Sequence, residues 1–195
     1  MIRIALDLEL NCDGTNPTEE IIQVGYCAFD TETGNILEVA GDYVCISKPL
    51  HPYITTLTGI TQKEIDDQGV SLEQAYKNLM SFFEKHDAGF RQIITWGGGD
   101  LSALKDELTF KGFTGWTLGR SECNAKAIYQ AYRVANGAKH QSGLKNSMNK
   151  VGLKWNTFKE IDLNGNTKER TAHNAKCDAL NTAIMYMFLS NKLKD

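Results

Sequence analysis

The sequence predicts an α/β protein in which a mixed five-stranded sheet, with three antiparallel strands followed by parallel ones, is flanked by helices. Extended apolar segments fill the first 46 residues, and helix-like spacing of apolar residues begins near residue 71. Strands joined by a short polar turn pair antiparallel, whereas strands separated by a helix pair in parallel. At 195 residues without a repeat or a linker, the chain is expected to be one domain, residues 1–195.

The first three strands are expected at residues 1–10, 20–29 and 36–46. Apolar side chains occupy every second position from Ile2 to Leu8, which is the period of a strand. The polar residues 30–35 form the turn between the second and third strands. These features predict an antiparallel meander.

Helices and strands then alternate. Ser71, with Gln74 three residues later, is a helix-start signal, and apolar residues recur with helical spacing up to Phe83. Further strands are expected at residues 92–96 and 116–118, and helices at residues 101–110, 122–136, 144–151 and 175–192. The pair Asn164-Gly165 predicts the turn of a β-hairpin within residues 157–171.

Charge and composition exclude several classes of protein. A formal net charge of −3 lacks the basic excess of an architectural nucleic-acid binder. Five cysteines without a Cys-x-x-Cys pair suggest neither a disulfide framework nor a zinc site. No apolar run is long enough to span a membrane, and Arg3 and Asp7 interrupt the region where a signal peptide would be apolar. We therefore expect a cytoplasmic protein without a membrane partner.

Acidic residues near the two ends of the chain give the strongest functional signal. Asp7 and Glu9 share one face of the first strand, because successive side chains of a strand alternate. His173 and Asp178 are five residues apart, about 140° on a helix, so we expect His173 on a loop and Asp178 in the helix that follows. Carboxylates at a strand end suit Mg²⁺ or Mn²⁺. The pattern predicts phosphodiester hydrolysis with two metal ions.

Five short motifs occur in a specific order: Asp7-x-Glu9, Gln23-Val24-Gly25, Leu57-Thr58-Gly59-Ile60, Trp96 to Asp100, and His173-x-x-x-x-Asp178. In this order, from about Arg3 to Met187, the chain resembles the DnaQ-like 3′-to-5′ exonucleases with a catalytic histidine, the DEDDh group of the ribonuclease H-like superfamily. Residues 58–61 and 96–97 are most similar to the branch that contains the histone-mRNA and small-RNA 3′-end exonucleases.

The resemblance implies a metal-dependent exonuclease with a ribonuclease H-like fold. Such an enzyme would hydrolyse single-stranded DNA or RNA from the 3′ end to nucleoside 5′-monophosphates with two divalent cations, Mg²⁺ or Mn²⁺. The implied metal ligands are Asp7, Glu9, Asp100 and Asp178, and the implied general base is His173. The residues implied around the terminal nucleotide are Leu10, Leu57 and Ile60.

Each catalytic candidate also has a plain structural interpretation. Asp100 precedes a helix and could be its N-cap. Asp7 and Glu9 could be solvated charges at a strand end, and His173 a surface residue. Asp178 could be a first-turn acid that complements the helix dipole. The order of all five residues together is what favours an exonuclease site.

Other segments allow two interpretations each. Leu57 could pack in the core instead of contacting a nucleotide, and residues 157–171 could be a substrate flap or a surface excursion. Between Glu122 and Glu160 there is no acidic residue, so the stretch is either a solvated basic face or a route for a single strand. Its basic residues are Lys126, Arg133, Lys139, Lys145, Lys150, Lys154 and Lys159. Gly99 stands where many relatives have an aromatic residue, which puts a stacking contact in doubt.

Two other functions compete with a free-standing exonuclease. One is a non-catalytic nucleic-acid-binding or adaptor module, and the other is a proofreading or processing subunit that works with a polymerase or helicase. A homodimer is a further alternative. The sequence does not distinguish DNA from RNA, because the 2′-hydroxyl is recognised by local geometry.

Overall fold

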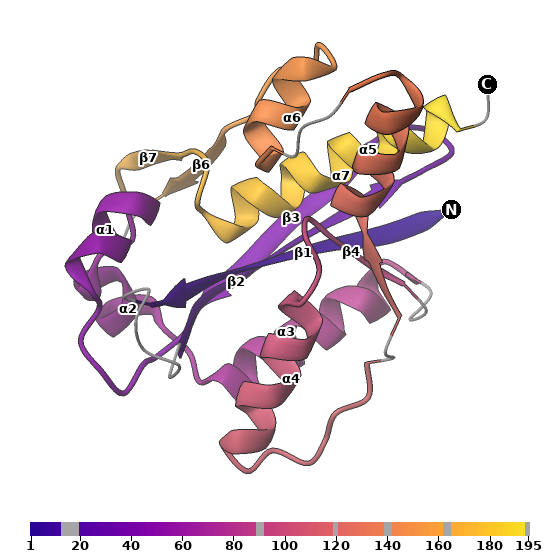
Figure 1. Cartoon of the computed structure of the whole chain (residues 1–195). Coiled ribbons are helices and arrows are strands. Elements are labelled where there is room, and N and C mark those ends of the chain that lie inside the picture. Colours follow the sequence, from indigo (N-terminus) through magenta and orange to yellow (C-terminus); the bar gives the residue numbers. More distant parts are fainter. Residues whose placement is uncertain (13–19, 89–91, 119–120, 139–141, 162–164, 194–195) are drawn as a thin grey trace.

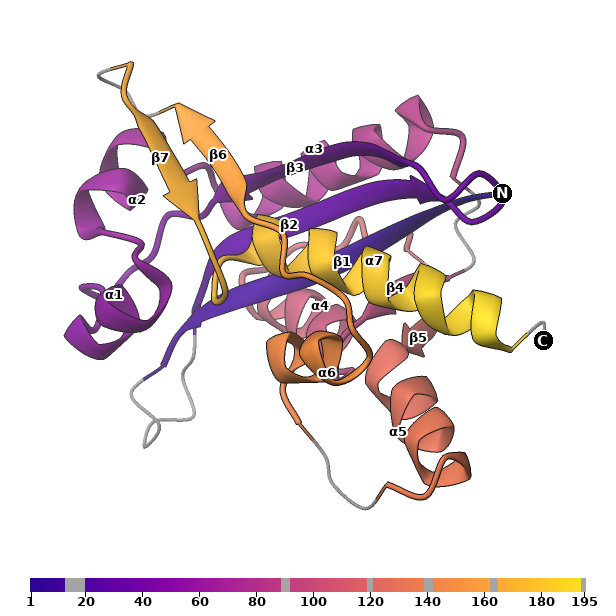
Figure 2. The same ribbon diagram turned by 90° about the horizontal axis from the view of Figure 1, so that it is seen from above.

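The computed structural model describes residues 1–12, 20–88, 92–118, 121–138, 142–161 and 165–193. Its centre is a five-stranded sheet in the order β3-β2-β1-β4-β5, with helices over both faces (Figure 1, Figure 2). The strands are β1 (Ile2–Asn11), β2 (Glu20–Asp30), β3 (Ile36–Tyr43), β4 (Ile93–Thr95) and β5 (Glu122–Asn124). The first three are antiparallel, while β4 pairs in parallel with β1 and with β5, so the predicted mixed sheet is confirmed.

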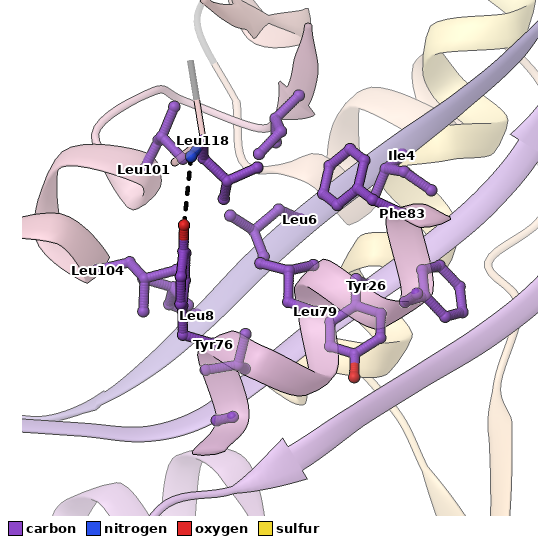
Figure 3. Close-up of a cluster of buried hydrophobic side chains, with 14 of the residues drawn as sticks. Ile4, Leu6, Leu8, Tyr26, Tyr76, Leu79, Phe83, Leu101, Leu104 and Leu118 are labelled. Carbon is purple, nitrogen blue, oxygen red and sulfur yellow. Dashed lines mark hydrogen bonds between the residues drawn. The ribbon is translucent and has the colours of Figure 1, made fainter. Parts of the chain in front are cut away.

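β1 is buried on both faces because its side chains divide between two helical layers. Ile4, Leu6 and Leu8 pack in the larger apolar cluster with α3 (Leu72–Lys85) and α4 (Asp100–Phe110), part of which Figure 3 shows. Ala5 points to the opposite face, which α7 (Ala175–Lys192) covers. Since strand side chains alternate, Asp7 and Glu9 share the face of Ala5 and point to the α7 side.

The remaining helices on the α7 side are α5 (Ala125–Ala135) and α6 (Leu144–Lys150), which lie beside α7 in Figure 1. Tyr129, Met148 and Met185 form a small apolar cluster between them. β6 (Phe158–Ile161) and β7 (Thr167–Arg170) form a separate antiparallel hairpin, as predicted. The expected turn residue Asn164 lies outside the described residues. No helix of the described segments combines the length and apolar character needed to span a membrane.

Sequence reasoning missed two helices, α1 (Pro52–Thr58) and α2 (Gln62–Gln68), each only seven residues long. Two turns are too short for apolar periodicity to stand out. Their start signals were nonetheless present. His51 caps the helix that Pro52 begins, and Thr61 forms a reciprocal capping box with Glu64.

The fifth strand was predicted wrongly at residues 116–118. This stretch is apolar because it packs on α3: the Trp116 ring stacks on Tyr76 at 5.1 Å, and the Tyr76 hydroxyl accepts the N–H groups of Thr117 and Leu118. Figure 3 shows the bond to Leu118 as a dashed line. The strand lies instead at Glu122–Asn124, so the next helix begins at Ala125, later than the expected residue 122. β3 likewise ends before the expected residue 46.

Candidate metal centre

Three carboxylates from two distant segments meet on the α7 side of the sheet. Asp7 and Glu9 come from β1, and Asp178 comes from the first turn of α7. Each offers one oxygen atom, and these atoms all lie within 4.8 Å of one another. The fold therefore brings together three of the four predicted metal ligands.

β2 allows the start of α7 to lie close to the sheet. Gly25 pairs with Asp7 on the neighbouring strand, and a Cβ on Gly25 would lie 2.1 Å from the carbonyl carbon of Ala175. Only glycine leaves room for this contact. Buried Gln23 then accepts the N–H of Ala175 through Oε1 at 2.8 Å. The Gln23-Val24-Gly25 motif thus sets the position of the helix that carries Asp178.

Burial and mutual repulsion raise the pKa values of the clustered acids. Burial raises the pKa of Asp178 to about 7. Burial, and then the charges of Asp178 and Asp100, raise the pKa of Glu9 to about 8. The pKa of Asp7 lies well above its usual range, first because of burial and then because of the neighbouring carboxylates. A bound cation would relieve this repulsion by favouring the charged forms.

The donor atoms of the cluster fit a hard divalent cation. Asp178 Oδ1 is buried and has no hydrogen-bond partner among the described residues, whereas its Oδ2 accepts the backbone N–H of His173 at 3.2 Å. A buried polar atom without a partner is costly unless a ligand or water satisfies it. All the donors are carboxylate oxygens, which Mg²⁺ and Mn²⁺ prefer.

Asp100 lies near the cluster, as the first residue of α4. The N-cap of that helix is Gly99, so the interpretation of Asp100 as an N-cap is wrong. Gly97, Gly98 and Gly99 have φ values of 121°, 76° and 104°, a region that glycine adopts without strain. Burial, and then the charge of Glu122, raise the pKa of Asp100 to about 6. Asp100 is outside the set of oxygens within 4.8 Å, although its charge raises the pKa values of both strand acids.

Two residues of β5 hold the glycine loop that presents Asp100, and sequence reasoning missed both. Glu122 accepts the N–H of Gly99 with both carboxylate oxygens at 3.1 Å, and it accepts the Thr95 hydroxyl at 2.8 Å. Asn124 accepts the N–H of Gly97 at 3.3 Å and donates to its carbonyl oxygen at 2.8 Å. Their spacing of two, which places both side chains on one face of a strand, was the available signal.

Loss of the Glu122 carboxylate is expected to weaken activity through the loop. Glu122→Ala frees the Gly99 N–H and should lower the cleavage rate by about 10- to 100-fold, the usual effect of removing a residue that orients a metal ligand. Glu122→Gln keeps one acceptor oxygen and should stay much closer to the parent. Single-turnover kinetics on a labelled strand measure this. Equal losses in the two variants would show that the charge of Glu122, rather than its hydrogen bonds, matters.

His173 lies on the loop before α7, as predicted, and its side chain is exposed. Its φ of 63° places it in the left-handed region, which is uncommon for a residue with a side chain. The bond from its N–H to Asp178 Oδ2 ties this backbone conformation to the carboxylate cluster. A loop position lets the imidazole move when a substrate binds.

The three residues expected around a terminal nucleotide differ in exposure. Leu10 is partly buried at the edge of the larger apolar cluster. Leu57 is 36% exposed, so its interpretation as a core residue is wrong. The Ile60 side chain is fully buried beside Ile22 and Ile54. Of the basic stretch, Lys139 lies outside the described residues, and both interpretations of the stretch stay predictions.

A family model for exonucleases, RNase_T, matches residues 4–107, more than half of the 195 residues. The chain belongs to this exonuclease family. The matched part contains Asp7, Glu9 and Asp100, whereas His173 and Asp178 follow it in the chain. No curated protein sequence matches the chain significantly.

Several solved nucleases have a similar fold. The nuclease domain of 3′hExo, a DEDDh family member bound to rAMP, has a TM-score of 0.78 and 19% identity over 98% of this chain and 92% of that one. Cell-death related nuclease 4 has a TM-score of 0.79 and 20% identity over 98% of this chain and 64% of that one. E. coli Exonuclease I in complex with a dT13 oligonucleotide has a TM-score of 0.71 and 16% identity over 99% and 42%.

The exonuclease family assignment and the shared fold together confirm the DnaQ-like, DEDDh-type assignment and the ribonuclease H-like architecture. The chain spans less than two thirds of the length of most of these structural neighbours. A 3′-exonuclease that recognises the histone mRNA stem-loop is also similar, with a TM-score of 0.78 at 20% identity. Because identity this low shows the fold alone, the expected branch of the family stays a prediction.

Proposed function

We propose that the protein is a metal-dependent 3′-to-5′ exonuclease that releases nucleoside 5′-monophosphates from single-stranded DNA or RNA. The observation that carries this proposal is the convergence of Asp7, Glu9 and Asp178 within 4.8 Å in a chain of the exonuclease family. The complexes of similar folds with rAMP and with a single-stranded oligonucleotide support the substrate class.

In this proposal, the carboxylates hold two divalent cations, Mg²⁺ or Mn²⁺. Asp7, Glu9 and Asp178 would hold one of them, and Asp7, with help from Asp100, would hold the other. When bound, such a pair stabilises the charge on the attacking and leaving oxygens of an in-line displacement. The chain supplies rigid ligand positions, because Gly25 and Gln23 fix α7 and Glu122 fixes the loop before Asp100.

His173 is the proposed general base. It accepts the proton of the attacking water, a role that imidazole fills near neutral pH. The bond from the backbone N–H of His173 to the Asp178 carboxylate supports this role. Leu10, Leu57 and Ile60 are the residues proposed to receive the 3′-terminal nucleotide, and of these Leu57 is exposed.

A strand-end assay tests the proposal. With Mg²⁺ or Mn²⁺, the parent should release nucleoside 5′-monophosphates from a linear strand with a free 3′ hydroxyl, and excess chelator should stop the reaction. A circular single strand of the same sequence should survive, because it has no free 3′ end. Products are separated on denaturing gels and by chromatography.

Matched DNA and RNA oligonucleotides, single- and double-stranded, complete the assay. Equal cleavage of circles and linear strands would make the protein an endonuclease. Full activity in excess chelator would exclude the metal mechanism. Binding without cleavage would favour the adaptor alternative, and native mass measurements would detect a homodimer or a polymerase or helicase partner.

A further inference from the structure

A network of charges holds the base of the β6–β7 hairpin. Its members, called here the clamp network, are Glu64, Glu160, Lys168, Arg170 and Lys176. Arg170 contacts Glu64 at 2.5 Å and Glu160 at 2.6 Å, Lys168 contacts Glu64 at 2.7 Å, and Lys176 pairs with Glu160. These residues come from α2, both hairpin strands and α7, and Figure 2 shows α2 beside the hairpin.

Four of the five members of the clamp network are shielded from water, whereas the Lys168 side chain is 36% exposed. The Arg170 side chain is 4% exposed, and those of Glu64, Glu160 and Lys176 are 12–14% exposed. Shielded ion pairs with several hydrogen bonds resist opening, because separating them leaves buried charges without partners. The clamp network therefore holds the hairpin in one position, which argues against the interpretation of residues 157–171 as a substrate flap that moves on a hinge.

One side of the clamp network reaches the segment expected to receive the terminal nucleotide. Arg170 Nη1 and Lys168 Nζ donate to the carbonyl oxygen of Gly59 at 3.1 and 3.0 Å. Gly59 lies between exposed Leu57 and buried Ile60. The Lys168 and Arg170 side chains thus fix the position of this segment relative to the hairpin.

The other side of the clamp network reaches the loop that carries His173. Arg170 precedes this loop, and Lys176 follows it two residues before Asp178. The Arg170 and Lys176 side chains both donate hydrogen bonds to the Glu160 carboxylate. Residues 171–175 are therefore pinned at both ends to one acidic side chain.

We propose that the clamp network is a positioning device that holds the terminal-nucleotide segment at a fixed separation from the His173 loop. The proposal rests on the proposed exonuclease function. The members of the network are positioning residues, since they act through Gly59 and the His173 loop. A displacement of about 1 Å at a reacting group can cost about 100-fold in rate, so a rigid connection between the two parts has a kinetic role.

Two lysines allow the network to be tested without removing buried Arg170. In Lys168→Met and Lys176→Met, each carboxylate keeps Arg170 as a partner, so the fold should persist. Lys168→Met loosens Gly59 and should raise KM with little change in kcat. Lys176→Met loosens the His173 loop and should lower kcat by about 10- to 100-fold. Lys168→Arg and Lys176→Arg should restore most of each loss.

Lys159→Met is the matched control. Lys159 lies on β6 and lines the same cavity of about 310 Å³ as Lys168 and Lys176, but it forms no salt bridge with any residue that the structure describes. Its substitution removes one positive charge from the same surface, so any change of KM in Lys159→Met measures a general loss of attraction for nucleic acid, and the effects of Lys168→Met and Lys176→Met are compared with it. This control separates positioning from a general loss of attraction for nucleic acid.

Hydrogen exchange of the metal-free protein gives a readout that does not depend on activity. Backbone amides of residues 171–175 should exchange faster in Lys176→Met and in Glu160→Gln than in the parent or in Lys159→Met. If the parent has no nuclease activity, the proposed function fails, whereas faster exchange still supports the mechanical connection. Kinetics and exchange in the lysine variants equal to those of Lys159→Met would overturn the inference.

Discussion

Asp178→Asn is expected to abolish nuclease activity and to make the metal-free protein more stable. The substitution removes a cation ligand, and it also removes a charge from a buried cluster in which the pKa of Asp178 is raised to about 7 by burial. Relief of that penalty should increase the free energy of unfolding at pH 8 by about 1–3 kcal/mol. Asp7→Asn should behave in the same way, since the pKa of Asp7 is raised by burial and by Asp178.

The pH dependence has a definite sign. Because the folded pKa values of Asp178 and Glu9, about 7 and 8, exceed those of the unfolded chain, the folded protein binds more protons between pH 4 and pH 8. The free energy of unfolding contributed by these groups therefore falls as pH rises through this range. Saturating Mg²⁺ should reverse much of the loss, because it binds the charged carboxylates of the folded state.

Denaturant titrations at pH 5 and pH 8, in chelator and in Mg²⁺, measure these changes. Asp106→Asn is a suitable control, because Asp106 is an exposed acid on α4, the helix that Asp100 begins. It should change neither activity nor the pH dependence. If Asp178→Asn is less stable than the parent at pH 8 without metal, the Asp178 charge does not destabilise the folded protein. If the variant keeps its nuclease activity, Asp178 is not a metal ligand.

His173→Ala should lower the single-turnover rate by about 10²–10⁴-fold, the range for a positioned proton acceptor. Metal affinity should hardly change, because no carboxylate has been removed. The parent rate should rise with pH, because a general base accepts a proton only in its neutral form, and this limb should vanish in the variant. With the proposed nucleotide contacts and cation ligands intact, the variant should also retain bound substrate. Calorimetry and rates across pH measure these effects.

A second histidine provides the comparison. His86 lies at the C-terminal end of α3, and its side chain forms a hydrogen bond with Glu38. The variant His86→Gln should keep the rise of the rate with pH. Weakened metal binding in His173→Ala would make His173 a ligand. If the rate of His173→Ala still rises with pH as in the parent, His173 has no role in proton transfer.

The sequence predicted the sheet and the acidic cluster because both depend on local periodicity. Alternation along β1 places Asp7 and Glu9 opposite the apolar face, and this face is set by Ile4, Leu6 and Leu8. The helical angle between His173 and Asp178 likewise predicted a loop followed by a helix, as the structure shows. Regular structure repeats over few residues, so its pattern is visible in one sequence.

The features that were missed depend on partners far away in the chain. Trp116 belongs to an apolar stretch that packs on Tyr76 of α3, and no residue near Trp116 in the sequence indicates that partner. Glu122 holds Gly99 across 23 residues, and Arg170 holds Gly59 across 111 residues. Tertiary contacts of this kind override local preference, so the clamp network could not be predicted from spacing, and the spacing of Glu122 and Asn124 did not outweigh the more apolar stretch at residues 116–118.

The close contact between Gly25 and the start of α7 limits which substitutions the carboxylate cluster can accommodate. Because main-chain atoms of β2 and α7 touch where a Cβ would lie 2.1 Å from Ala175, the gap across the carboxylate cluster is set by atomic radii of the backbone. Rotamer changes elsewhere on α7 leave that gap unaltered. A single methyl group on Gly25 would widen it, so the dimensions of the carboxylate cluster depend on a residue that has no side chain.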